Sequence, residues 1–180
     1  MSDAGADARV DPPLLSDEAT TLRAFLDYHR ETLRRKCAAL TQEQLAQKLP
    51  PSRMTLGGLM KHLAIVESAW LESTFAGGED MPPFDRVDWD ADPDWAWHTA
   101  SDDTPEELLA LYDEAVRRAD VVIDAGLDAG GLDARSVREN PNTGSPFSLR
   151  WLLVHLIEEY ARHNGHADLI RESIDGLTGD

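Results

Sequence analysis

The sequence is poor in cysteine, in long apolar runs and in basic residues, and each shortage excludes a class of protein. Its 180 residues include one cysteine, Cys37, so an internal disulfide is excluded and a reducing compartment such as the cytoplasm is expected. No apolar run approaches the roughly 20 residues that a membrane-spanning helix needs, so we expect no membrane partner. Basic residues number 17 against 34 acidic ones, a formal net charge of −17. Because such a surface repels phosphate backbones, we expect no nucleic-acid partner either.

Cys37 lies among apolar residues at helical spacing, which favours a small buried side chain over a reactive thiol. Residues 1–13 are rich in Asp and Ala and carry no apolar stretch, so we expect a flexible N-terminal arm there. The remainder, 14–180, has the size of one ordinary domain.

Four long segments carry apolar residues at helical spacing, and turn-rich stretches separate them. The segments are 17–40, 54–75, 104–125 and 148–174, and a shorter helix is expected over 41–49. Capping boxes at Thr41 and Thr104 mark two of the starts, and Gly126 is expected to end the helix that begins at Thr104. No segment has a convincing strand pattern. The sequence therefore predicts an all-α protein, a four-helix bundle with long connecting loops.

The segment 80–101 has no sustained helical period, yet it holds three tryptophans, Trp89, Trp95 and Trp97. A polar linker would not contain so many large aromatic rings, so we expect this loop to pack onto the bundle. Whether its tryptophans wall a pocket or only pack stays open at this point.

The last expected helix gathers four titratable side chains on one face. Counting about 100° per residue, His155, Glu159, His163 and His166 fall within an arc of about 80°, beside apolar neighbours. Burying several such groups is costly unless they pair or bind a cation. Glu159 and His163 are four residues apart, so both can bind one ion, and this donor pair suits Zn²⁺, Fe²⁺ or Ni²⁺.

A third ligand has to come from another helix, and His62 is the candidate because it lies on the apolar stripe of its segment. Three protein ligands leave coordination positions open for water or substrate, as in catalytic zinc sites. Spacing alone also fits a satisfied core histidine, or a buried polar network without metal.

Two stretches resemble motifs of the DinB-like (YfiT-like) metalloproteins: 148–168 is similar to their last helix and 55–67 to their second. The resemblance runs in the same helix order from about Leu14. It implies a four-helix bundle in which His62, Glu159 and His163 hold a divalent metal, zinc first and nickel as the alternative. Many members have His where this chain has Glu159. The metal-binding domain of mycothiol-dependent maleylpyruvate isomerase, which the chain resembles closely, has a similar His, Glu, His set.

The resemblance also implies a function and further roles. A metal in this family activates a low-molecular-weight thiol of the mycothiol type, and we expect S-transfer to an electrophile, in detoxification. The isomerase carries an additional C-terminal domain that follows its bundle, so its own reaction is not expected. His155 and His166 are expected in the second shell or the pocket, and a homodimer is a family-level expectation. A hydrolase that uses a metal-bound water and a metal-binding or sensor module without activity remain the alternatives.

Overall fold

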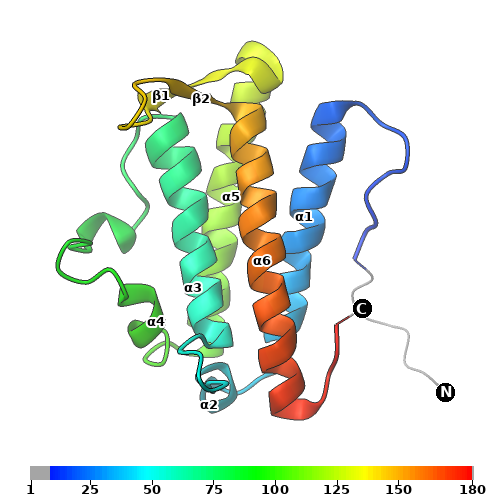
Figure 1. Cartoon of the computed structure of the whole chain (residues 1–180), viewed down its shortest axis with the longest axis vertical. Helices are drawn as coiled ribbons and strands as arrows, with labels where there is room; N and C mark the ends of the chain where they lie inside the picture. Colours follow the sequence, from blue (N-terminus) through cyan, green and yellow to red (C-terminus); the bar gives the residue numbers. More distant parts are fainter. Residues whose placement is uncertain (1–8, 180) are drawn as a thin grey trace.

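The computed structural model describes residues 9–179, and its main body is a bundle of four long helices (Figure 1). These are α1 (Glu18–Cys37), α3 (Leu56–Glu67), α5 (Pro105–Gly130) and α6 (Leu149–Asp175), and α3 continues as the π-helix η1 (Ser68–Phe75). The predicted all-α bundle is confirmed. Helices α3 and α5 run in the same direction, opposite to α1 and α6, so a long connection has to return the chain between α3 and α5 (Figure 1).

Side chains at the helix starts explain where the helices begin. The Asp17 carboxylate accepts a hydrogen bond from the Thr20 amide and caps α1, and Ser148 caps α6 in the same way. The capping boxes expected at Thr41 and Thr104 are both formed. Each satisfies amide donors that the first turn of a helix leaves unpaired. The short helix α2 (Gln42–Leu45) ends earlier than predicted.

Helix α5 does not end at Gly126, and this prediction was wrong. Gly126 is buried inside the helix, which continues to Gly130. A Cβ atom at Gly126 would lie 2.9 Å from the ring of Phe75 and 3.1 Å from a methyl group of Leu149. The glycine therefore allows neighbouring helices to approach α5, and it does not act as a helix terminator here.

The expectation that no strand would form was also wrong. Strands β1 (Arg135–Glu139) and β2 (Pro146–Ser148) make a short antiparallel hairpin over one end of the bundle (Figure 1). A tight turn closes it, in which the Gly144 amide donates to the carbonyl of Asn140 at 2.8 Å. Polar residues had predicted the turn, but the pairing depends on tertiary contacts with the end of η1 that a local pattern does not reveal.

The segment 80–101 packs onto the bundle, as expected. It contains the 3₁₀-helix η2 (Phe84–Arg86) and the short helix α4 (Trp95–Thr99), and Phe84 is fully buried. The ammonium group of Lys61, on α3, donates to Thr99 Oγ1 at 2.9 Å and pairs with Asp103. These bonds hold α4 beside the middle of α3.

A polar network inside the core takes one residue from each long helix. Arg30 of α1 makes a bidentate ion pair with Glu67 of α3, with both N···O distances 2.7 Å. The Tyr160 hydroxyl of α6 donates to Glu67 at 2.9 Å, and the Tyr112 hydroxyl of α5 donates to Tyr160 at 2.8 Å. None of the four side chains is more than 1% exposed. Burial raises the pKa of both tyrosines, so each hydroxyl keeps the proton it donates.

The division into an arm, 1–13, and a domain, 14–180, stays a prediction, and residues 1–8 and 180 lie outside the described residues. No helix in the described range 9–179 is long and apolar enough to cross a membrane. After α5, the 3₁₀-helix η3 (Gly131–Asp133) makes a single turn that leads into the hairpin.

Candidate metal centre

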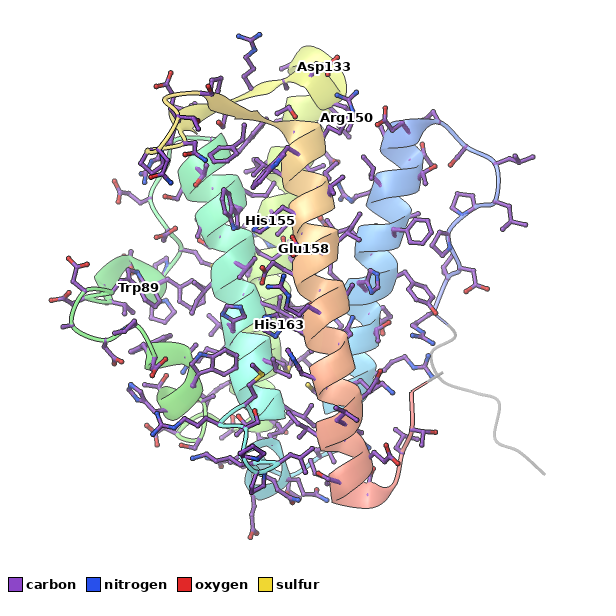
Figure 2. All side chains as sticks on the ribbon, viewed as in Figure 1. Trp89, Asp133, Arg150, His155, Glu158 and His163 are labelled. Carbon is purple, nitrogen blue, oxygen red and sulfur yellow. The ribbon has the colours of Figure 1, made fainter. Side chains whose placement is uncertain are left out.

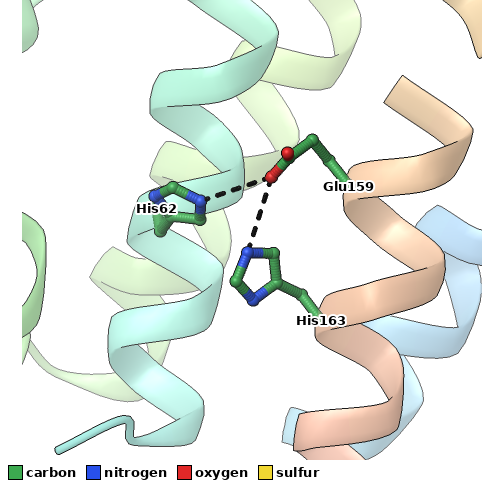
Figure 3. Close-up of side chains that lie close together, drawn as sticks. All are labelled: His62, Glu159 and His163. Carbon is green, nitrogen blue, oxygen red and sulfur yellow. Dashed lines mark ion pairs between the residues drawn. The ribbon is translucent and has the colours of Figure 1, made fainter. Parts of the chain in front are cut away.

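Three predicted ligand residues meet between α3 and α6 (Figure 3). Glu159 and His163 are one turn apart on α6, and His62 faces them from the middle of α3. The Glu159 Oε2 atom lies 3.5 Å from His163 Nε2 and 3.8 Å from His62 Nε2. All three ligand atoms lie within 4.8 Å of one another. The bundle therefore brings together residues almost a hundred positions apart in the sequence.

The site is closed on one side and open on the other. The exposed fraction of the side chain is 8% for His163, 16% for Glu159 and 28% for His62. A small molecule can thus approach from the His62 side, whereas His163 forms the floor. Arg162 also lies near the carboxylate, with its Nη1 3.6 Å from Glu159 Oε1.

Both imidazoles are neutral at pH 7. The pKa of His163 is lowered to about 4, mainly by burial and in smaller part by the nearby His62, His166 and Arg162. Burial also lowers the pKa of His62, although the Glu159 carboxylate opposes this effect. A neutral imidazole has a free nitrogen lone pair, which is the form that binds a metal.

The donor set fits a divalent cation. Donor atoms about 2.0–2.2 Å from one tetrahedral ion lie roughly 3.3–3.6 Å apart. The two separations from Glu159 Oε2, 3.5 Å and 3.8 Å, are close to this range. The same two separations are longer than those of good hydrogen bonds. One carboxylate and two neutral imidazoles supply a single negative charge, which suits a divalent ion with open positions.

The two other histidines of α6, His155 and His166, lie differently, and Figure 2 labels His155 and His163. His166 follows His163, and its Nδ1 lies 3.4 Å from His163 Nδ1, on the side of that ring away from Glu159. His155 lies one turn nearer the hairpin, stacked on Trp151 at 5.0 Å and against Trp70 at 4.8 Å. Only His166 therefore contacts a triad residue directly.

The tryptophans of the 80–101 segment take separate places. The Trp97 indole stacks on the His62 imidazole, with ring centroids 5.1 Å apart and planes at 24°. Trp95 covers the Lys61 ammonium at 4.4 Å, and Trp89, which Figure 2 labels, packs against Trp95. Gly58 makes room for Trp97, because a Cβ atom there would lie 2.8 Å from the indole. Trp97 thus walls the triad, while the other two tryptophans pack.

Sequence reasoning missed Gly58 and the core network of Arg30, Glu67, Tyr112 and Tyr160. Two signals were present: the glycine one turn before His62, and a charged Glu67 inside an otherwise apolar helix. Neither pattern shows that Gly58 faces Trp97 or that Glu67 faces Arg30, because both contacts join segments far apart in the sequence.

The triad and bundle agree with the comparison with known families. A model of the family described as mycothiol-S-transferase matches residues 21–176, which includes every residue of the triad and its wall. A search of curated proteins gave no match. Because the family model covers most of the sequence, the chain belongs to the mycothiol-S-transferase family, a DinB-like family.

Proposed function

We propose that the protein is a metal-dependent transferase that joins a low-molecular-weight thiol of the mycothiol type to an electrophile. His62, Glu159 and His163 hold the metal in this proposal, with zinc as the first choice and nickel as the alternative. The observation that carries it is the convergence of three ligand atoms within 4.8 Å in a site that is partly exposed through His62. The family match supports the thiol and the transfer.

The chain needs a supplied thiol because its own cysteine is unsuitable. Cys37 is buried, and burial raises its pKa to about 12. Its sulfur lies 3.8 Å from the carbonyl of Leu56, to which the thiol donates. A protonated, enclosed thiol is a poor nucleophile at neutral pH. The reacting sulfur in the proposed reaction therefore belongs to the cosubstrate.

The residues around the site have distinct tasks in this mechanism. A divalent metal bound to the triad would supply Lewis acidity, which lowers the pKa of a thiol that binds to it. His163 forms the floor, Trp97 keeps water from one face of His62, and the exposed edge of His62 admits the reactants. The thiolate sulfur then bonds to the electrophilic carbon. The leaving group departs with its electron pair, and the thiol proton passes to solvent.

The first experiment measures bound metal by mass spectrometry in protein purified without a chelating resin. We expect about one divalent ion per chain in the wild type and a loss of most of it in His163→Ala, because two ligands bind far more weakly than three. The matched control is His155→Ala, which removes a histidine from the same helix outside the triad. Substoichiometric metal in both wild type and His163→Ala contradicts the proposal.

A second experiment separates transfer from the two alternative functions. The metal-loaded protein is incubated with the electrophile monochlorobimane, with and without mycothiol. Product that forms only with the thiol supports transfer, whereas consumption of an electrophile without thiol indicates hydrolysis by a metal-bound water. No thiol binding by calorimetry and no turnover point to a binding or sensor module.

Several wider expectations stay predictions. They are a role in detoxification, a place in the cytoplasm, a homodimeric state and the absence of a nucleic-acid partner. Second-shell or pocket roles for His155 and His166 also belong to this group.

A further inference from the structure

A hollow near the triad lies beside the short helix α4. Its volume is about 540 Å³, and it lies between the connection 48–54 and the short helix α4. Trp97 lines this cavity and also stacks on His62, so one indole borders both places. A ligand in the cavity would therefore lie one aromatic ring away from the triad.

The charge of the cavity differs from that of the rest of the protein. Two basic side chains, Lys48 and Arg53, line it, although the chain carries a net charge of −17. Most other basic residues form ion pairs, such as Arg30 with Glu67 and Arg150 with Asp133. Within residues 9–179, neither Lys48 nor Arg53 has an ion-pair or hydrogen-bond partner through its side chain. Two unpaired cations at one cavity offer a place for an anion.

The remaining lining residues define what else the ligand must carry. Met54 and Trp97 supply an apolar surface, which suits a planar or apolar body. The acidic Asp94 also lines the cavity, and within residues 9–179 it forms no ion pair with Lys48 or Arg53. His98 also lines the cavity, but its Nε2 already contacts both carboxylate oxygens of Asp92 at 2.8 Å.

We propose that this cavity binds an aromatic carboxylate, with Lys48 and Arg53 pairing with the carboxylate and Trp97 and Met54 contacting the ring. Such a ligand would be the electrophilic substrate, or a part of it, held beside the triad. That assignment as substrate rests on the proposed function, but binding in the cavity does not require metal. Trp97, which would contact the ring, also stacks on His62, so the bound carboxylate would lie close to the triad.

The test is a ligand-observed NMR titration of the chelator-treated full chain with 4-nitrobenzoate and with the neutral isostere 4-nitrobenzamide. We expect 4-nitrobenzoate to bind about tenfold more tightly, because hydrogen bonds to charged groups are the stronger class. Its affinity should fall as the salt concentration rises. Equal affinities for the two probes, or no binding of either, overturn the proposal.

A charge-matched pair of variants shows where the anion binds. Lys48→Gln combined with Arg53→Gln should weaken 4-nitrobenzoate about tenfold or more. Arg86→Gln combined with Arg135→Gln removes the same charge from exposed positions that do not line the cavity, and should change affinity less than about twofold. Equal losses in both double variants overturn the proposal, because they indicate a general charge effect.

The outcomes also separate this inference from the proposed function. If the wild type contains metal and transfers the thiol, yet 4-nitrobenzoate does not bind, the cavity proposal fails alone. If 4-nitrobenzoate binds through Lys48 and Arg53 in a chain that never holds metal, the proposed function fails and the anion site stands.

Discussion

Two clusters of polar side chains lie on neighbouring turns of α3 and α6, yet their contacts differ. The core network, made of Arg30, Glu67, Tyr112 and Tyr160, has hydrogen bonds of 2.7–2.9 Å and is closed to solvent. The triad of His62, Glu159 and His163 has separations of 3.5–3.8 Å and is partly open. Glu67 lies five residues after His62, and Tyr160 directly follows Glu159.

The difference separates a structural cluster from one that can accept a ligand. In the core network the charge of Glu67 meets Arg30, and its remaining capacity is taken by the Tyr160 hydroxyl. A satisfied buried network ties helices together and has little left to bind anything else. In the triad burial keeps both imidazoles neutral, and no short bond uses their lone pairs. Unused donors that face one point are what a metal requires.

The largest effect should follow from breaking the core network. Glu67→Ala leaves the Arg30 guanidinium buried beside Tyr160 without its bidentate partner. Removing one member of a buried ion pair costs about 3–5 kcal/mol. Because Arg30 Nη1 keeps its ion pair with Asp120 at 2.8 Å, the free energy of unfolding should fall by the lower end of that range. Urea denaturation of the chelator-treated protein, followed by circular dichroism, measures it.

The control for this change is Glu159→Ala under the same conditions. Glu159 is 16% exposed and makes no short bond to either histidine, so its loss should change the free energy of unfolding by less than about 1 kcal/mol. Similar losses in the two variants would show that the triad is as structural as the core network.

A smaller effect is expected from His166, through its contact with His163. When His163 Nδ1 carries the proton and donates it to His166 Nδ1, the Nε2 lone pair is left free to face Glu159. His166→Phe keeps a ring of similar size but removes the acceptor. Changes of this kind reduce metal affinity about 10- to 100-fold, which a competition titration with a chromogenic chelator measures. If His166→Phe binds the metal as tightly as the wild type, His166 only packs against His163 and does not orient it.

The sequence predicted the local features of the fold and of the triad, but not the contacts between distant residues. Helical spacing and capping boxes predicted the four long helices, because both signals are local. Spacing also placed Glu159 and His163 on one face of α6, and the apolar stripe of α3 made His62 a candidate. The hairpin, the continuation of α5 through Gly126 and the Arg30–Glu67 pair were missed. Each depends on which residue lies opposite in space, and no local pattern carries that information.

Acid should destabilise the metal-free protein through the histidines of the triad. The pKa of His163 is about 4 in the folded chain, against about 6.5 when unfolded. Between these values the unfolded chain binds the additional proton, so stability is fully present above pH 6.5 and is lost as the pH falls toward 4. The loss at pH 5 is at most about 2 kcal/mol, reduced by solvent screening at this partly open site.

The measurement compares unfolding at pH 7 and pH 5 for the chelator-treated wild type and His163→Gln, which cannot take up that proton. We expect a shallower pH dependence in the variant, with a remainder from His62, whose pKa is lowered too. Identical pH dependence in the two proteins would mean that protonation of His163 is not coupled to folding.

The smallest effect should come from His155, which shares the helix and the residue type with His163 but not its surroundings. His155 stacks on Trp151 and contacts Trp70, four residues before Glu159 along α6. Since its ring contacts neither imidazole of the triad, His155→Gln should change metal affinity by less than about twofold in the competition titration that tests His166. A loss as large as that expected for His166→Phe would mean that the aromatic cluster around Trp151 positions Glu159, and the metal centre would then extend one turn further toward the hairpin.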